Sequence, residues 1–192
     1  MKRYIVALTG ASGIIYGIRL VEELLKAGFE VHLIVSDPAC TVIKQELNWK
    51  LDEEVEDTFR KLLPGNLYFY KNYDIGAGIA SGSFLTEAMI VIPCSMSSIS
   101  NIAHGTSKNL VERAADVMLK EKRRLIVVPR ETPLSSIHLR NMLLLSEMGV
   151  HVVPAMPGFY HRPQTLDEVV DFVVGKVMDA MNIPHSLFQR YK

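Results

Sequence analysis

The sequence predicts a single α/β domain with a doubly wound, mainly parallel sheet of the Rossmann or flavodoxin type. Several short apolar runs are continuous rather than alternating, which is typical of strands covered by helices on both faces. Amphipathic helical patterns separate these runs, and the alternation of strand and helix indicates right-handed crossovers between parallel strands. The expected strands span residues 4–9, 31–35, 88–92, 125–128 and 150–153.

The expected helices follow from their apolar stripes and from their end signals. Gly28 and Gly149 come just after two of the helical patterns, where a glycine commonly ends a helix. Thr165 precedes the last pattern, and Glu168 three residues later predicts a capping box. The expected helices span residues 14–26, 109–120, 136–148 and 166–181.

Two segments lack a clear helix or strand pattern. Residues 63–82 are rich in Gly, Asn and Tyr, and we expect a long loop there, which in a compact domain is often functional. The residues from about 184 onward are expected to form a short C-terminal arm that packs on a neighbouring subunit. Residues 1–192 are thus predicted to be one domain with an arm.

The composition excludes several classes of partner. The 21 basic and 21 acidic residues cancel, so no overall basic field attracts nucleic acid or an anionic membrane, and neither is an expected partner. No apolar stretch reaches the length of a transmembrane helix. The two cysteines, Cys40 and Cys94, lack metal-binding or redox spacing. We therefore expect no metal, and the cytoplasm is the expected compartment.

The first strand is followed by small residues that suit an anion. Doubly wound folds bind ligands outside the carboxyl ends of their strands, and here Gly10, Ala11 and Ser12 follow the first run. Small residues let a phosphate approach the backbone, and the next helix offers N–H groups and its positive end. A tight turn without a ligand is the competing interpretation. The glycine spacing is not G-x-G-x-x-G, although Asp37 could bind a ribose, so a nicotinamide cofactor is a weaker alternative.

Hydroxyl groups follow other strands. Ser36 ends the second run, and the loop at residues 81–83 contains the hydroxyl of Ser81. These groups could bind phosphate or the polar edge of a ring, or they could be ordinary helix N-caps. Cys94 lies at a strand tip, but no base stands beside it in the sequence, which favours an inert buried thiol over a nucleophile. The stretch after the third run holds Ser95, Met96, Ser97 and Ser98.

Charged side chains supply the remaining candidates. Arg130 and Glu131 come directly after a buried strand, where they could hold an anion and act as an acid or base, or form a salt bridge that fixes the loop. Arg113 and Lys120 lie two helical turns apart and can project on one side, although a solvated helix face explains them as well. Glu46 lies in a helical stretch and is not selected by pattern alone.

The loop at residues 154–163 combines prolines with aromatic residues after the fifth strand. Such a loop suits a lid over a flat or apolar ligand, with a packed surface loop as the alternative. Tyr160 and His161 lie in it, and a histidine at such a place is more often hydrogen-bonded in a loop than catalytic.

Several short motifs occur in order along nearly the whole chain. They are Thr-Gly-Ala-Ser-Gly at 9–13, Ala-Ser-Gly-Ser at 80–83, Pro-Cys-Ser at 93–95, Glu-Arg-Ala-Ala-Asp-Val at 112–117, Leu-Lys-Glu at 119–121, Val-Pro-Arg-Glu-Thr-Pro-Leu-Ser at 128–135 and Pro-Gly-Phe-Tyr-His-Arg-Pro-Gln at 157–164. In this order they resemble the flavin prenyltransferase family, the UbiX/Pad1-like proteins, within the flavin-containing decarboxylase-like flavoproteins. Single motifs are moderately specific, whereas the ordered set is highly specific.

The resemblance implies a reaction and its partners. Members of that family transfer a dimethylallyl group from dimethylallyl phosphate to N5 and C6 of reduced FMN, without a metal. Their product, prenylated FMN, is used by a UbiD-type decarboxylase. They form homo-oligomers, often dodecamers, with active sites at subunit interfaces. Whether the donor is a monophosphate or a pyrophosphate stays open, because the cations present suit both.

The resemblance also implies roles for individual residues. Two positions depart from the family: Lys176 stands where many relatives have Arg, and Tyr191 where they often have Trp. The residues with an implied catalytic role are Ser12, Glu46, Lys120 and Glu131. The implied FMN contacts are Gly10, Ala11, Ser12, Ser36, Ser81, Ser95, Met96, Ser97, Ser98 and Arg130. The implied contacts of the prenyl phosphate are Arg113, Lys120, Arg130, Tyr160 and Lys176.

Three other functions are open alternatives. The chain could be an FMN-dependent decarboxylase of cysteine-containing substrates, although such enzymes would not need the full set of cations. It could be the flavin-binding subunit of an aromatic-acid decarboxylase system. It could also be a flavin-binding module without catalysis.

Overall fold

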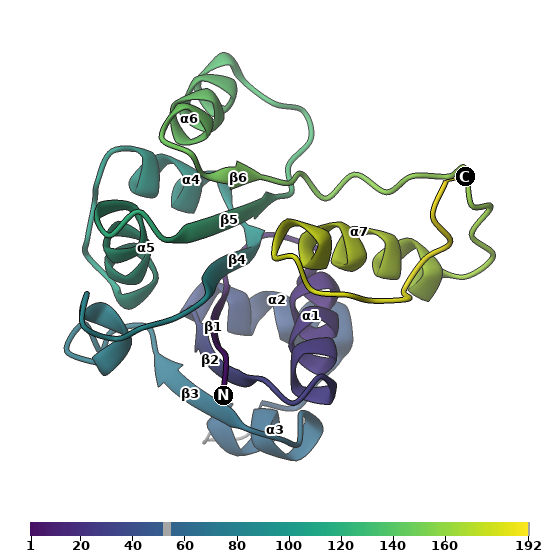
Figure 1. Ribbon diagram of the computed structural model, residues 1–192, viewed down its shortest axis with the longest axis horizontal. Helices are drawn as coiled ribbons and strands as arrows, with labels where there is room; N and C mark the ends of the chain where they lie inside the picture. The colour runs from purple at the N-terminus through teal and green to yellow at the C-terminus, as the bar shows by residue number, and fades with distance from the viewer. Residues whose placement is uncertain (52–54, 192) are drawn as a thin grey trace.

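A computed structural model describes residues 1–51 and 55–191 as one α/β domain (Figure 1). Within these residues the sheet has six strands, and every neighbouring pair is parallel. The elements in chain order are β1 Arg3–Leu8, α1 Ile14–Lys26, β2 Glu30–Val35, α2 Asp37–Leu47, α3 Val55–Leu62, β3 Leu67–Lys71, the 3-10 turn η1 Gly78–Ala80, β4 Ala88–Cys94, α4 Met96–Ala103, α5 Leu110–Lys120, β5 Arg124–Pro129, α6 Ser136–Glu147, β6 His151–Val152 and α7 Leu166–Ala180.

The order of the strands in the sheet determines where a ligand-binding crevice forms. It is β3-β2-β1-β4-β5-β6, the Rossmann order, so the doubly wound prediction is confirmed and the flavodoxin variant is not observed. The chain winds outward from β1 through β2 to β3, and then returns to place β4 on the other side of β1. The carboxyl ends of β1 and β4 are therefore the switch point of the sheet, where a crevice opens between diverging loops.

Most predicted elements are confirmed to within about two residues, and one prediction is wrong. Residues 63–82 are not a structureless loop, because they contain β3 and η1. β3 pairs only with β2 at the edge of the sheet, and its central aromatic side chains are partly exposed. It therefore lacks the continuous apolar run by which the other strands were recognised. Helices α3 and α4 were also not predicted.

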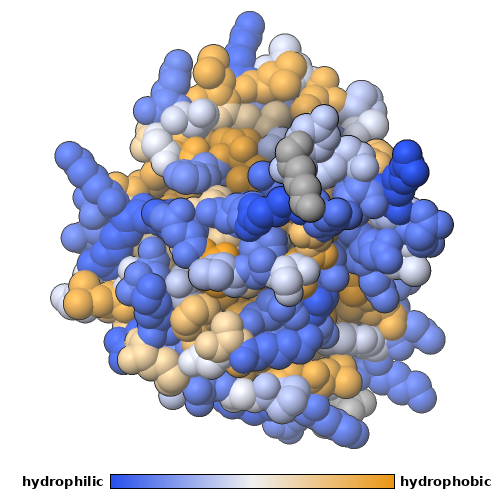
Figure 2. Space-filling view, turned by 45° about the vertical axis from the view of Figure 1, so that its right-hand side comes forward, coloured by the Kyte–Doolittle hydropathy of each residue, from blue (hydrophilic) through white to orange (hydrophobic). Residues whose placement is uncertain are grey.

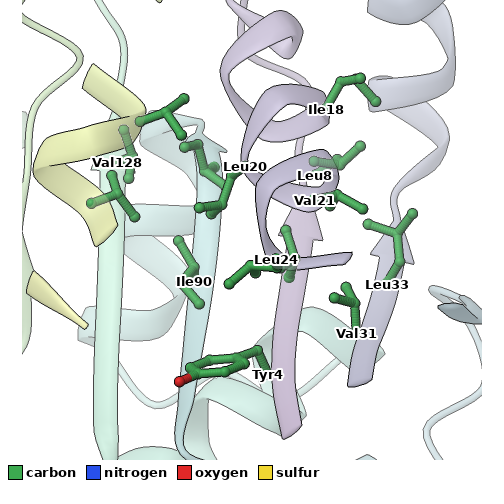
Figure 3. Close-up of a cluster of buried hydrophobic side chains, with 14 of the residues drawn as sticks. Tyr4, Leu8, Ile18, Leu20, Val21, Leu24, Val31, Leu33, Ile90 and Val128 are labelled. Atoms are coloured by element: carbon green, nitrogen blue, oxygen red, sulfur yellow. The ribbon is translucent and has the colours of Figure 1, made fainter. Parts of the chain in front are cut away.

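One face of the sheet is covered by α1, α2, α3 and α7, which enclose the larger core (Figure 3). Leu20 and Leu24 of α1 are fully buried there, together with Leu8 of β1 and Ile90 of β4. Gly17 allows this packing, because a Cβ at that position would collide with Leu8 and with the backbone of β4. The close approach places the start of α1 directly over the switch point.

The other face is covered by α4, α5 and α6, but α6 contributes little to the core. Ile99 of α4 and Ala114 and Met118 of α5 are buried against the sheet. Of the twelve residues of α6, only Asn141 and Leu145 are buried. This helix therefore leaves most of its surface, including several leucines, open to solvent.

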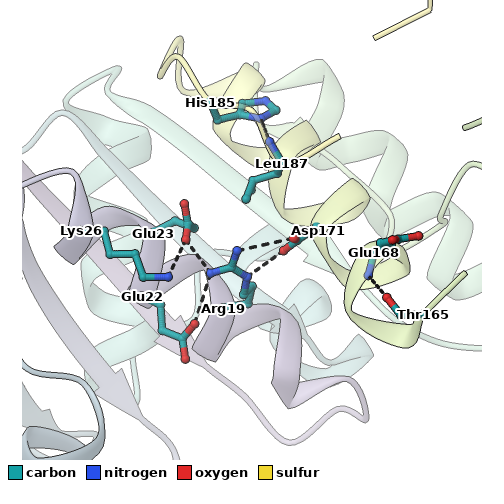
Figure 4. A network of polar contacts seen from close by, with 9 residues as sticks. All are labelled: Arg19, Glu22, Glu23, Lys26, Thr165, Glu168, Asp171, His185 and Leu187. Atoms are coloured by element: carbon teal, nitrogen blue, oxygen red, sulfur yellow. Dashed lines mark hydrogen bonds and ion pairs between the residues drawn. The ribbon is translucent and has the colours of Figure 1, made fainter. Parts of the chain in front are cut away.

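Polar contacts tie α7 to α1 and start its first turn (Figure 4). Arg19 of α1 donates to the Asp171 carboxylate over 2.7 Å. Thr165 accepts the backbone N–H of Glu168 at 3.2 Å, as the sequence predicts. The Glu168 carboxylate, however, accepts from Gln164 at 2.6 Å rather than from Thr165, so the reciprocal half of the capping box is wrong.

The C-terminal arm folds back along α7, the helix that precedes it. The residues after Ile183 that the structure describes form no helix or strand. Arg190 donates to both oxygens of Asp179, at 2.7 and 3.2 Å. The Phe188 ring lies so close to Gly175 that a Cβ at position 175 would overlap it. Packing of the arm on a neighbouring subunit stays a prediction. None of the described helices is long and apolar enough to span a membrane.

A buried histidine links two strands on the face that carries α5. His32 Nε2 lies 2.8 Å from Glu30 Oε1, and its Nδ1 lies 2.9 Å from the Tyr70 hydroxyl. Since a carboxylate only accepts, Nε2 carries the hydrogen and Nδ1 accepts from Tyr70. Burial lowers the pKa of His32 although Glu30 favours the charged form. The folded protein therefore keeps this ring neutral to a lower pH than the unfolded chain does.

We expect the stability to fall as the pH drops below about 6.5. In that range the unfolded chain protonates His32 while the folded state does not, so protons accumulate on the unfolded state and favour it. His32→Gln can still donate to Glu30 and accept from Tyr70, and it should remove this part of the slope. Thermal unfolding between about pH 5 and pH 8 measures the effect, with the exposed His151→Gln as control. Equal slopes for His32→Gln and the unchanged chain would contradict it.

Candidate active site

A cavity of about 330 Å³ opens at the switch point of the sheet. It receives residues from the loops after β1, β2, β3 and β4 and from the start of α5. Its position agrees with the expectation that the ligand site lies at the carboxyl ends of the strands. Its lining consists of Thr9, Gly10, Ser36, Pro38, Asn72, Ser95, Ser97, Ser98, Asn101, Asn109, Val111 and Glu112.

The Thr9 hydroxyl fixes the two central strands to each other at this edge. It donates to the Pro93 carbonyl oxygen at 2.7 Å and accepts the backbone N–H of Ser95 at 2.9 Å. Thr9 is buried, where an unmade hydrogen bond would be costly, so both partners are held in place. The loop that begins at Ser95 is thus attached to the end of β1.

Two helices direct their N-termini toward the cavity. The Ser36 hydroxyl caps α2 by accepting the N–H of Ala39 at 3.3 Å. The Ser95 hydroxyl caps α4 by accepting the N–H of Ser98 at 3.2 Å, and it also lies 3.0 Å from the Ser98 hydroxyl. These two serines are therefore N-caps, as the alternative interpretation held. Helix N-termini attract anions, so capping and anion binding coexist here.

The donor set of the cavity fits a phosphate with a polyol chain. A Cβ at Gly10 would overlap Pro38 at the start of α2, so only glycine leaves the backbone this close. The one buried carboxylate in the lining, Glu112, is already engaged by Asn101 at 2.7 Å and by the N–H of Lys108 at 2.8 Å. The hydroxyls and the helix ends around it are donors.

The N-terminus of α1 is already occupied by a carboxylate of the chain itself. The N–H groups of Gly13 and Ile14 donate to Glu46 at 3.0–3.1 Å. Glu46 comes from α2, so it acts as the missing side-chain cap of α1. The expectation that these N–H groups are free for a phosphate is therefore wrong. Among the described residues, the N–H groups of Met96 and Ser97 at the start of α4 donate to no acceptor, whereas α2 offers only the N–H of Asp37, because Pro38 has none and Ala39 donates to Ser36.

Arg130 and Glu131 are separate from each other. The Arg130 guanidinium donates to the carbonyl oxygen of Ser12 at 3.1 Å, which joins the loop after β5 to the loop after β1. Glu131 is exposed and accepts only the N–H of Thr132, at 3.0 Å, among the described residues. The two side chains form no ion pair with each other, so the predicted alternative of a loop-fixing salt bridge is wrong.

Eleven of the predicted site residues gather at this edge, and we call them the carboxyl-edge cluster. Two of them point away from solvent: Ala11 is buried, and the Met96 side chain lies in the core, so only their backbones are available to a ligand. The cluster comprises Gly10, Ala11, Ser12, Ser36, Glu46, Ser95, Met96, Ser97, Ser98, Arg130 and Glu131.

Ser81 and Lys120 lie at the amino ends of the strands, opposite the carboxyl-edge cluster. Ser81 precedes β4, and Lys120 precedes β5, so both belong with the amino ends of the strands. β5 has six residues, which corresponds to about 20 Å at 3.3 Å per residue. One chain therefore does not bring these two residues to the carboxyl-edge cluster. Arg113 lies part-way along α5 and pairs with Asp116 at 3.2 Å.

Tyr160 and Lys176 form a third group with the C-terminal arm. The Tyr160 ring meets Phe172 and Tyr191 edge-on, with centroids 5.8 and 5.7 Å away. Lys176 lies 3.7 Å from Asp179. His161 stacks on Phe172, and its two ring nitrogens contact no donor or acceptor in the described part of the chain. The prediction of a hydrogen-bonded loop histidine is therefore wrong.

The remaining candidate, Cys94, is buried, and burial raises the pKa of its thiol. A protonated, enclosed thiol is a poor nucleophile, so the prediction of an inert cysteine is confirmed. Among the described residues, no group of three or more acidic, histidine or cysteine side chains could hold a metal ion.

Comparison with known proteins places this geometry in a family. The family model for Flavoprotein matches residues 1–178. The flavin prenyltransferase UbiX of Halalkalibacterium halodurans is 53% identical over 190 residues, which cover 98% of this chain and 92% of that protein. The chain belongs to the flavin prenyltransferase family. The resemblance seen in the ordered motifs is confirmed.

Solved structures of this prenyltransferase family match the fold closely. AnUbiX (PadA1) in complex with FMN and dimethylallyl pyrophosphate has a TM-score of 0.92 and 38% identity, covering 100% of this chain and 97% of that one. A dodecameric FMN-dependent UbiX-like decarboxylase from Escherichia coli O157:H7 has a TM-score of 0.91 and 43% identity, covering 99% of both chains. The FMN-dependent cysteine decarboxylase TvaF, at 16% identity and a TM-score of 0.59, shares the fold alone.

Several cavity residues of this prenyltransferase were missed by the sequence analysis. Thr9 stands inside the first motif, but its role depends on a strand distant in sequence. Asn72 follows β3, the strand that was not predicted, so the rule that ligands meet strand ends would have found it. The missed residues that line the cavity are Thr9, Pro38, Asn72, Asn101, Asn109, Val111 and Glu112.

We expect Glu46→Ala to lower the free energy of unfolding by about 1 kcal/mol, the usual effect of losing an N-cap. The substitution leaves the N–H groups of Gly13 and Ile14 without their acceptor. Thermal or urea unfolding of the flavin-free protein measures the loss. Gln45→Ala, at an exposed position of the same helix, is the matched control and should change little. Equal losses for the two variants would show that the carboxylate does not cap α1.

Proposed function

We propose that the chain is a flavin prenyltransferase that moves a dimethylallyl group from dimethylallyl phosphate to N5 and C6 of reduced FMN. The observation that carries this proposal is the cavity at the switch point, with its hydroxyls and the N-termini of α2 and α4, in a chain of this family. The product, prenylated FMN, would serve a UbiD-type decarboxylase. Cys40 and Cys94 are free thiols, which is compatible with the reducing cytoplasm that we propose as its compartment.

The carboxyl-edge cluster divides into two binding regions. Ser36 and residues 95–98 surround the N-termini of α2 and α4 and would hold the phosphate and ribityl chain of FMN. Ser12 and Arg130, joined by their 3.1 Å hydrogen bond, would border the ring. When bound, reduced FMN supplies the nucleophilic atoms N5 and C6. Glu46 keeps the loop that carries Ser12 in place through Gly13.

Prenyl transfer requires cations that stabilise the departing phosphate and a base that removes a proton from the flavin. Cleavage of the allylic C–O bond is easier if the departing phosphate meets fixed cations, and Arg113, Lys120, Arg130 and Lys176 are the candidates. Ring closure requires loss of the proton from C6, for which a carboxylate is a suitable base. Glu131 is exposed and free of an ion pair within the described residues. Tyr160 would exclude water from the allyl group.

The separation of the candidate residues supports a homo-oligomer. The carboxyl-edge cluster, the pair Ser81 and Lys120, and the group around Tyr160 do not meet in one chain through any contact between described side chains. A site assembled from several copies would unite them. The UbiX-like relative from E. coli is dodecameric, which supports assembly of this chain into a homo-oligomer.

Helix α6 offers the surface that such assembly needs. Several of its apolar side chains face solvent, with Ile137 64% exposed, Leu139 53% and Leu143 59%. The apolar side chains at the top of Figure 2 lie at the end of the molecule where Figure 1 shows α6. Exposed apolar side chains that gather on one helix are typical of an interaction surface, so we propose that another copy covers them.

The test of the function is mass spectrometry of the flavin. The purified protein is incubated anaerobically with reduced FMN and dimethylallyl phosphate, and in parallel with the pyrophosphate. A gain of one prenyl unit with release of phosphate is expected. Bound but unmodified FMN with both donors would contradict the proposal. Release of carbon dioxide from a peptidyl-cysteine substrate would instead identify a cysteine decarboxylase.

We expect Glu131→Gln to bind FMN as the unchanged protein does and to lose most of the ring-forming step, about 100-fold or more in rate. The amide keeps the size of the side chain but accepts no proton. Flavin fluorescence measures binding, and the yield of prenylated FMN measures the reaction. Glu147→Gln, at the exposed end of α6, is the control. Full activity of Glu131→Gln would remove Glu131 from the mechanism.

We expect the double variant Leu139→Glu, Leu143→Glu to lower the mass of the assembly in light scattering while its circular dichroism stays that of a folded α/β protein. The two positions are one helical turn apart, and two carboxylates there would have to be desolvated in an interface. Leu166→Glu, at a 74% exposed position of α7, is the control. An unchanged mass for the double variant would show that copies meet elsewhere.

A further inference from the structure

Arg123 uses its guanidinium to hold a loop rather than to meet a ligand. Its Nη1 donates to the carbonyl oxygen of Phe84 at 2.8 Å, and its Nη2 donates to that of Gly82 at 2.6 Å. It stands between α5 and β5, and the loop it holds lies between η1 and β4. One side chain thus holds two carbonyls that are 39 and 41 residues away in sequence.

The clamped loop lies directly against Lys120. A Cβ at Gly82 would overlap the Glu121 carboxylate and would come 3.3 Å from Lys120 Nζ. Lys120 in turn pairs with Glu121 at 3.0 Å. The absence of a side chain at position 82 therefore lets the loop and the lysine share one small area. We call residues 81–84 together with Lys120, Glu121 and Arg123 the amino-edge unit.

The amino-edge unit contains Ser81 and Lys120, the two candidate site residues that lie at the amino ends of the strands, far from the cavity of their own chain. The Ser81 hydroxyl accepts the N–H of Ser83 at 3.2 Å, so its oxygen is held within the loop. Ser81 and Lys120 are both exposed. The length of β5, about 20 Å, separates them from the carboxyl-edge cluster of the same chain. They can act in the reaction only at the cavity of another copy.

We propose that Arg123 is a positioning residue for prenyl transfer. It holds Ser81 beside Lys120 so that a hydroxyl and a cation enter the cavity of a neighbouring copy as one preformed unit. This inference rests on the proposed function, and it adds a residue that touches neither flavin nor prenyl donor. The guanidinium fork is the reason for arginine here, because a lysine ammonium cannot serve both carbonyls in the same fixed geometry.

The first test separates donor binding from flavin binding. For Arg123→Leu we expect an unchanged assembly mass and only a small loss of FMN affinity, because Ser81 is one of many implied FMN contacts. We also expect a rise in KM for dimethylallyl phosphate and a loss in kcat/KM of about 10- to 100-fold, as misplacement of catalytic groups by about 1 Å produces. Arg123→Lys should recover only part of the loss, and it carries the test if the leucine variant fails to assemble. Arg124→Gln, the next residue, which donates no hydrogen bond to residues 81–84, is the control.

The second test asks whether the unit serves another copy. Arg123→Leu and Arg130→Leu chains are co-expressed with different tags, and mixed assemblies are purified through both. Activity should return, because some sites then combine an intact amino-edge unit with an intact carboxyl-edge cluster. Arg123→Leu mixed with Lys120→Ala should show no recovery above the residual activity of Arg123→Leu alone, because both chains carry a damaged unit.

The outcomes are distinct. Unchanged kcat/KM in Arg123→Leu, or recovery in the mixture with Lys120→Ala, would overturn the role of Arg123. Absence of recovery in the mixture with Arg130→Leu would place the unit and the cluster in the same site of one chain and would also overturn it. Absence of prenyl transfer by the unchanged protein would instead overturn the proposed function.

Discussion

The pairing of β1 with β4 is the constraint on which the rest of the site depends. The parallel register is buried in the centre of the sheet, and the Thr9 hydroxyl closes it at the carboxyl end through Pro93 and Ser95. Because the chain winds away from this pair in both directions, the loops after β1 and β4 diverge and leave a crevice. Gly17 lets α1 lie against both strands. The loops that carry the candidate residues thus begin at fixed points, and the site takes its rigidity from the core.

Internal charges decide where an anion can bind at this edge. The N-termini of α2 and α4 border the cavity, and α1 begins after the loop from β1 at the same end of the sheet; each of these helix ends attracts negative charge. Glu46 satisfies the N-terminus of α1, while Asn101 and the backbone of Lys108 satisfy the buried Glu112. What is left is a donor-rich region around α2 and α4, set apart from the region of Arg130 and Glu131. In the proposed reaction, the chain's own acidic groups would therefore separate the region that binds the phosphate from the region where the prenyl group is transferred.

A single copy of the chain holds the parts of the proposed reaction but does not assemble them. In a parallel sheet the two edges stay apart by the full length of the strands, so groups at the amino edge cannot reach a cavity at the carboxyl edge. Assembly of several copies brings opposite edges together, and it would also cover the exposed apolar residues of α6. The proposed role of Arg123 follows from this assembly. The amino-edge unit would enter the cavity of another copy, and a loop that is rigid before it docks loses less conformational entropy.

The sequence by itself determined the layer architecture, most element positions and the edge of the sheet that binds ligands, because these depend on local periodicity and on the handedness of crossovers. The ordered motifs determined the family. The tertiary structure decided what depends on residues far apart in sequence. It showed β3 at the sheet edge, where half-exposed aromatics hide the strand pattern, and it gave the N-terminus of α1 to Glu46 rather than to a phosphate. It also showed that Ser81 and Lys120 lie at the amino ends of the strands, opposite the carboxyl-edge cluster. Motif spacing records position along the chain, whereas only the folded sheet records on which of its two ends a motif lies.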